Sequence, residues 1–159
     1  MTVHIPQETK LTIFGATGRV GRHVLEQAVA AGHDVTAVVR NPGKLTTPVQ
    51  TVVMDMRAPE PVALKSALDG ADAVLSCLGP QGRAEHGIVS TGTRAVVEAM
   101  EAAGGRRLVV ISGVGVSTRT AYGRNLRGAF RISRADAAHL MLALVGRPEA
   151  VRQTVTVAY

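Results

Sequence analysis

Gly15-Ala16-Thr17-Gly18-Arg19-Val20-Gly21 is the stretch that decides the fold of this chain. It follows the apolar residues 11–14 and opens an amphipathic segment over residues 20–31, which indicates the order strand, glycine-rich turn, helix. Glycine lets the backbone turn sharply and lets a phosphate approach the main chain without meeting a Cβ atom. A following helix directs N–H groups and its positive dipole end at that phosphate. The stretch therefore predicts a site for a nucleotide pyrophosphate, with a tight turn that holds no ligand as the alternative.

The length and composition favour one globular domain over residues 1–159. Hydrophobic residues make up 46% of the chain and charged residues 19%, and no apolar run approaches the ~18 residues of a membrane span. Residues 1–10 lack the apolar core of a signal peptide, and the single Cys77 excludes an internal disulfide. We therefore expect a cytoplasmic protein without a membrane partner.

The charge balance permits binding of a nucleic acid and equally suits a ligand that carries several phosphates. The formal net charge is +6, the sequence pI is about 10.4, and arginine supplies most of the positive charge. Aromatic residues make up only 3% of the chain and tryptophan is absent, so the sequence offers no stacking platform for nucleic-acid bases. We therefore do not favour a nucleic acid as the partner.

The order of elements predicts an α/β fold, a Rossmann-like doubly wound parallel sheet. Apolar runs that read as strands alternate with segments of helical periodicity. The expected strands cover residues 10–14, 33–39, 49–54, 71–78 and 107–111, and the expected helices cover residues 20–31, 59–68 and 88–103.

This alternation stops after the fifth strand, so we expect an abbreviated C-terminal part. Residues 113–132 contain four glycines and four arginines and fit neither a helical nor a strand period. Ser133, with Asp136 three residues later, is a good N-cap for a helix over residues 134–145. Residues 151–157 alternate in polarity and predict a final strand.

Two residues that end strands are candidates for binding the adenosine half of a dinucleotide. Arg40 ends the second strand, where an acid would bind the 2′-hydroxyl of NAD and an arginine accommodates the 2′-phosphate of NADP. A solvated arginine at a strand end is the alternative. Asp55 ends the third strand and can accept a hydrogen bond from the adenine amino group, or it can simply form a turn. The sequence thus favours NADP(H) over NAD(H).

The ends of the fourth and fifth strands supply the other candidates. Leu78 and Gly79 lie at the edge of the sheet where ligands bind in such folds, and Cys77 before them reads as a small buried residue. Ser112 is placed to meet the nicotinamide or the substrate, or to hydrogen-bond its own turn. A tyrosine–lysine proton-transfer pair is absent, because Tyr122 is followed four residues later by Leu126. The five histidines are scattered without ligand spacing, so we predict no metal site.

These motifs together resemble an atypical short-chain dehydrogenase/reductase. The resemblance rests on the stretch from Gly15 to Gly21, on Val39-Arg40-Asn41-Pro42, on Asp55, on Ser112-Gly113 and on residues 131–141. More narrowly, the chain is similar to the NmrA-like group and to the flavin reductase/biliverdin-IXβ reductase branch. Between Ser112 and Ser133, however, it lacks an internal block that members of the family carry, and residues 127–132 are a candidate for the strand that replaces it.

The resemblance implies a role for each matching position. Arg40 would bind the 2′-phosphate, Asp55 and Met56 would flank the adenine, and Ser112 would face the nicotinamide as the catalytic residue. Leu78 and Gly79 would line the ribose side. The loop residues that would hold the cofactor are Gly15, Thr17, Gly18, Arg19, Val20 and Gly21.

Members of this branch pass a hydride from NADPH to flavins or similar planar acceptors, often without the tyrosine–lysine pair. The resemblance therefore implies an NADPH-dependent reductase of a flavin-like or quinone-like small molecule. The alternative is a shortened NmrA-like paralogue that binds NADP(H) without catalysis and acts as a sensor or regulator. A third reading is a chain that pairs its open sheet edge with a second copy in a homodimer.

Overall fold

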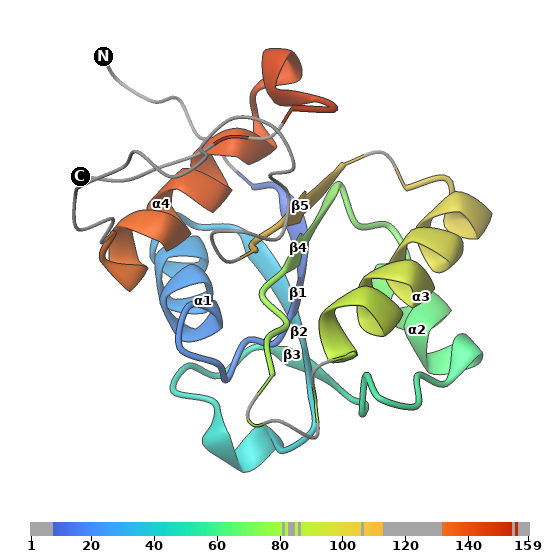
Figure 1. Ribbon diagram of the computed structural model, residues 1–159. Coiled ribbons are helices and arrows are strands. Elements are labelled where there is room, and N and C mark those ends of the chain that lie inside the picture. The colour runs from blue at the N-terminus through green and yellow to red at the C-terminus, as the bar shows by residue number, and fades with distance from the viewer. Residues whose placement is uncertain are drawn as a thin grey trace, which may run out of the picture.

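The computed structural model describes residues 8–80, 82, 85, 87–105, 107–112, 132–153 and 155 (Figure 1). Within these residues, five parallel strands form a sheet in the order β3-β2-β1-β4-β5. The strands are β1 (Lys10–Phe14), β2 (Asp34–Val39), β3 (Gln50–Val53), β4 (Ala73–Ser76) and β5 (Leu108–Val110). The predicted Rossmann-like parallel sheet is confirmed.

Helices cover both faces of this sheet. Helices α1 (Gly21–Ala30) and α4 (Arg134–Val145) lie on one face, and α2 (Pro61–Leu68) and α3 (Ile88–Ala103) lie on the other (Figure 1). Two short 3-10 turns, η1 (Pro42–Lys44) and η3 (Pro148–Ala150), follow β2 and α4. Among the described residues, no helix combines the length and the apolar character that crossing a bilayer requires.

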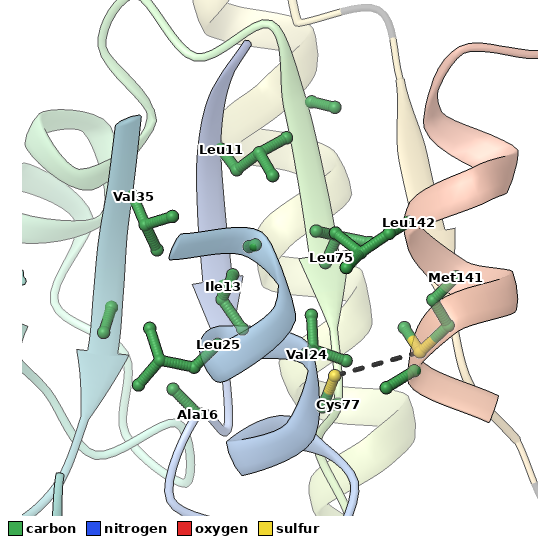
Figure 2. Packing of buried hydrophobic residues seen from close by; sticks show 14 of the residues in the cluster. Leu11, Ile13, Ala16, Val24, Leu25, Val35, Leu75, Cys77, Met141 and Leu142 are labelled. Carbon is green, nitrogen blue, oxygen red and sulfur yellow. Dashed lines mark hydrogen bonds between the residues drawn. The ribbon is translucent and has the colours of Figure 1, made fainter. Parts of the chain in front are cut away.

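The strands send alternate side chains into two separate cores. Leu11 and Ile13 of β1 are fully buried against α1 and α4, whereas Phe14 is fully buried against α2 and α3. Figure 2 shows Leu25 of α1 and Leu142 of α4 in the first of these cores. Because both faces of the sheet are covered, the inner strands read as continuous apolar runs.

The helix ends follow from local sequence. The Ser133 hydroxyl accepts a hydrogen bond from the backbone N–H of Asp136 at 3.0 Å, which confirms the predicted N-cap of α4. The Glu60 carboxylate caps α2 by accepting from two backbone N–H groups at its start. Gly32 and Gly104 follow α1 and α3 with φ angles of 83° and 73°, a conformation that favours glycine.

The prediction of a final strand over residues 151–157 is wrong. Val151 and Arg152 form a turn that continues η3, and Gln153 and Val155 belong to no strand. Arg152 has a φ angle of 59°, which is incompatible with extended backbone. Residues 154 and 156–159 lie outside the described residues. Residues 113–131 also lie outside the described residues. They include most of the abbreviated segment and most of the candidate strand over residues 127–132. Ile132, which is described, is not in a strand.

Candidate functional site

The parallel sheet gathers the predicted site residues along one edge. Gly15, Arg40, Asp55, Leu78 and Ser112 all follow the carboxyl ends of strands, from β1 through β5. β1 and β4 are neighbours, although the chain leaves β1 towards β2 and β3 before it returns to β4. Ligands of open α/β sheets bind at the carboxyl edge beside such a reversal of strand order. The site therefore lies where β1 and β4 end.

The glycine loop turns so tightly that Gly15 and Gly21 have no room for a Cβ atom, and a Cβ at Gly18 would lie 3.2 Å from the carbonyl oxygen of Gly15. Gly15 has a φ angle of 73°, and a Cβ atom there would lie 2.8 Å from the carbonyl oxygen of Cys77, the residue that follows β4. The N–H of Gly18 donates to the carbonyl of Gly15 at 2.9 Å. A Cβ at Gly21 would lie 2.0 Å from that same carbonyl oxygen. Because these three glycines carry no side chains, a phosphate can approach the main chain of this turn.

The start of α1 suits a negative charge. Its N-cap residue, Val20, contributes no side-chain hydrogen bond, and its first turn contains no acidic residue. The positive end of the helix dipole is therefore not neutralised by the helix's own side chains. Arg19 is exposed beside it, and Thr17 is half-buried in the loop. The residues present fit a pyrophosphate at this position.

Arg40 belongs to a cluster of four charged residues at the same edge. Its Nη1 atom lies 2.9 Å from Oε1 of Glu85, and Nη1 of Arg57 lies 3.7 Å from the same oxygen. Arg57 also donates from Nε to the carboxylate of Asp55 at 2.9–3.0 Å. These hydrogen bonds to Arg57 lower the pKa of Asp55 to about 2.

Sequence reasoning missed two members of this cluster, Arg57 and Glu85. The backbone N–H of Arg57 donates to Asp55 Oδ1 at 2.9 Å, which is the turn-forming role that the sequence left open for Asp55. The spacing of two residues between Asp55 and Arg57 could have signalled this turn. Nothing local could have signalled Glu85, which is 45 residues from Arg40 in sequence. The contact of Asp55 with adenine stays a prediction.

Met56 and Leu78 both lie beside Gly92 of α3. A Cβ atom at Gly92 of α3 would lie 2.7 Å from Cδ1 of Leu78 and 3.7 Å from Cβ of Met56. Gly92 therefore allows α3 to pack closely against the two residues expected near the adenosine. Met56 is buried and Leu78 is half-buried. Gly79 follows as an exposed residue, and no atom of the described part of the chain lies within 4 Å of the position that its Cβ would take.

Cys77 is a buried core residue, as the sequence indicated. Its Sγ lies 4.0 Å from Sδ of Met141 in α4, the contact drawn in Figure 2. Burial raises the pKa of the thiol to about 12, so the thiolate is absent at neutral pH. This environment does not support a nucleophile.

Ser112 completes the edge. It is exposed, two residues beyond the end of β5, and the chain that follows it lies outside the described residues. The structure thus places Ser112 at the predicted end of the sheet. Among the described residues, no group of three or more histidine, cysteine, aspartate or glutamate residues lies close enough together to hold a metal ion.

The chain is similar in sequence to a known protein family and to several known proteins. The sequence profile of a family described as NAD(P)H-binding matches residues 15–127, a span that begins at the first glycine of the loop. The chain is also 33% identical to the uncharacterized protein YwnB of Bacillus subtilis, in a match that covers 67% of this chain. It spans 48% of YwnB and only 12% of a Mycobacterium tuberculosis relative to which it is 32% identical.

Solved structures share the fold. A Rossmann-fold NAD(P)-binding family protein from Shigella flexneri superimposes with a TM-score of 0.68 over 92% of this chain and 89% of that chain, at 21% identity. A short-chain dehydrogenase/reductase superfamily protein from Agrobacterium tumefaciens, solved with bound NAD, gives a TM-score of 0.58 at 25% identity. That match covers 86% of this chain and 43% of the other.

Proposed function

The chain belongs to the NAD(P)H-binding family, and we propose that it binds NADPH in preference to NADH and reduces a flavin-like or quinone-like acceptor. Membership confirms the NAD(P)-binding, short-chain dehydrogenase-like character that the motifs indicated. The narrower likeness to the flavin reductase/biliverdin-IXβ reductase branch, the NADPH preference and the acceptor belong to the proposal.

The position of Arg40 carries the proposed preference for NADPH. Arg40 directly follows β2, and the loop that begins at Gly15 is tied to the same strand because the N–H of Gly15 points at the carbonyl of Val38, 3.4 Å away. The adenosine ribose of a dinucleotide lies at the end of the second strand in this fold. A guanidinium matches the geometry of a 2′-phosphate and stays charged at neutral pH.

The loop and the start of α1 would hold the pyrophosphate. The turn of Gly15, Gly18 and Gly21 admits phosphate oxygens to the main chain, and the dipole of α1 and the cation of Arg19 oppose their charge. Met56 and Leu78, packed at Gly92, would provide an apolar wall for the adenosine. When bound, NADPH supplies a hydride from its nicotinamide ring.

The residues at the reactive end support a planar acceptor. Ser112 lies at the end of β5, where its hydroxyl would orient the nicotinamide or the acceptor carbonyl. The chain has no lysine beyond Lys65, so a tyrosine–lysine pair for alcohol dehydrogenation is not available after β4. Flavins and quinones accept a hydride without that pair, because the charge on the reduced ring is delocalised.

Two titrations test the proposal. Purified protein is titrated with NADPH and with NADH, which differ only in the 2′-phosphate, and nicotinamide oxidation is then followed by stopped-flow absorbance with FMN or a soluble benzoquinone. We expect tighter binding of NADPH and acceptor-dependent oxidation. Binding without turnover of any acceptor would reject the reductase, and equal affinity in wild-type protein and in an Arg40 variant would reject the role of Arg40.

A further inference from the structure

We propose that Arg40 and Arg57 together form the 2′-phosphate site and that the carboxylate of Glu85 competes with the phosphate for it. Glu85 then determines how strongly the protein prefers NADPH over NADH. This inference rests on the proposed function, because it assumes that the dinucleotide binds at the end of β2. It adds two residues, Arg57 and Glu85, that neither the motifs nor the family membership assigns.

The first support is that one oxygen atom bridges both arginines. Oε1 of Glu85 lies 2.9 Å from Nη1 of Arg40 and 3.7 Å from Nη1 of Arg57. Two guanidinium groups that converge on a single oxygen from two different loops make an anion site. Oε1 of Glu85 occupies the position in that site that a phosphate oxygen would take.

The second support is that Asp55 holds Arg57 in position. Asp55 accepts hydrogen bonds from the Nε atom of Arg57 and from its backbone N–H, and the two side chains are also joined through Nη2. Asp55 thereby binds the edge of the guanidinium that carries Nε and Nη2, and Nη1 faces Glu85. The site is preorganised, since an anion arriving beside Arg40 meets a second arginine already oriented.

The third support is the charge of the cluster. Arg40 and Arg57 contribute two positive charges, and Asp55 and Glu85 contribute two negative charges, so the four side chains are neutral as a group. A phosphate added to this group would face Glu85 at close range, and like charges at that distance repel. The Glu85 side chain is only 13% exposed, so water screens this repulsion poorly. Phosphate and carboxylate therefore exclude each other.

The occupancy of the site by Glu85 sets the apparent affinity for NADPH. When a ligand binds only those molecules whose site is open, its apparent dissociation constant is the intrinsic constant divided by the fraction of molecules in the open state. NADH has a hydroxyl where NADPH has the phosphate, so it does not need the two arginines. Removal of the Glu85 charge therefore strengthens NADPH binding selectively, and removal of the Arg57 charge weakens it selectively.

The test measures the dissociation constants of NADPH and NADH for Glu85→Gln and Arg57→Gln by isothermal titration calorimetry. Arg94→Gln and Glu98→Gln, two exposed positions on α3, are the matched controls for loss of each charge. We expect Glu85→Gln to tighten NADPH about fivefold or more, with NADH changed less than about twofold. We expect Arg57→Gln to weaken NADPH about tenfold, also with little effect on NADH.

The outcomes separate this inference from the proposed function. If the wild-type protein binds neither nucleotide, the proposed function fails. If it binds NADPH through Arg40 but Glu85→Gln leaves the NADPH to NADH ratio unchanged, only the inference fails. A loss of NADH affinity in Glu85→Gln would also overturn it, because Glu85 would then bind the ribose hydroxyls. Glu85→Ala, with the same expected direction, is measured if Glu85→Gln does not fold.

Discussion

A Cβ atom at Gly21 would lie 2.0 Å from the carbonyl oxygen of Gly15, the residue with which the loop begins. The carbonyl oxygen belongs to the backbone, and the backbone of Gly21 fixes where a Cβ atom would lie, so no side-chain rotation can relieve the contact. We therefore expect Gly21→Ala to open the loop and to lower the free energy of unfolding by at least about 2 kcal/mol. Urea unfolding measures the loss of stability, and calorimetry with NADPH measures the accompanying loss of binding.

Gly82→Ala is the control for Gly21→Ala. A Cβ atom at Gly82 would meet no atom of the described residues within 4 Å, and the φ angle of Gly82 is not in the left-handed region. We expect its stability and NADPH affinity to equal those of the wild-type protein. Equal behaviour of the two variants would show that the close approach of Gly21 to Gly15 is not needed for the fold.

Arg40→Asp tests the cofactor preference through charge. The substitution replaces a guanidinium beside the expected 2′-phosphate with a carboxylate, so NADPH affinity should fall by about 2 kcal/mol or more. NADH affinity should barely change, because its ribose carries no phosphate. Titration of both nucleotides checks this, with Arg94→Asp on α3 as the control. Equal losses for NADPH and NADH would assign Arg40 a structural role instead.

The sheet could be predicted from the sequence because burial on both faces leaves a plain signal. Each inner strand carries an apolar run between turn residues, as in residues 10–14 and 71–78, and each run corresponds to a strand. The prediction of a strand over residues 151–157, which is wrong, rested only on alternating polarity. The turn at Arg152, with a φ angle of 59°, overrides that weak pattern.

The candidate site could be predicted only where a residue directly follows a strand. Gly15, Arg40 and Ser112 are placed by the ends of β1, β2 and β5, so their shared edge follows from the parallel order alone. Arg57 and Glu85 reach Arg40 from loops, and their contacts depend on the three-dimensional course of those loops. Pairing across 45 residues leaves no periodic signal in one sequence.

The buried thiol of Cys77 predicts slow chemical labelling. Cys77 is the chain's one cysteine, and burial raises its pKa to about 12. Ellman's reagent at pH 8 should therefore leave the native protein unlabelled over minutes and should react with one thiol per chain in 6 M guanidinium chloride. Rapid stoichiometric labelling under native conditions would contradict the packing of Cys77 against Met141.

Ser112→Ala tests the reactive end of the proposed site. If the hydroxyl orients the nicotinamide or the acceptor, its loss should lower kcat about fivefold to tenfold, on the scale of one hydrogen bond. The dissociation constant of NADPH should stay within about twofold, because the adenosine and pyrophosphate contacts remain. Steady-state kinetics with FMN and calorimetry with NADPH separate the two effects. An unchanged kcat would remove Ser112 from the reaction, and Ser90→Ala on the exposed side of α3 is the control.

His33 predicts how stability depends on pH. The residue lies between α1 and β2, is 8% exposed, and neither ring nitrogen has a hydrogen-bond partner among the residues that the structure describes. Burial lowers the pKa of His33 below its ordinary value of 6.5, because the charged ring would lose its hydration. Between pH 6.5 and the lowered pKa of the folded state, the unfolded chain therefore binds a proton that the folded chain does not.

The free energy of unfolding should fall as pH decreases from about 6.5 towards the lowered pKa of His33, and it should be independent of this residue above that window. His33→Leu removes the titrating group and should flatten this slope, whereas His139→Gln, on the exposed side of α4, should leave it unchanged. Urea unfolding at intervals between pH 5 and 8 measures the slope for all three proteins. If the His33→Leu protein keeps the full slope of the wild-type protein, another group is responsible and the buried ring of His33 is not the cause.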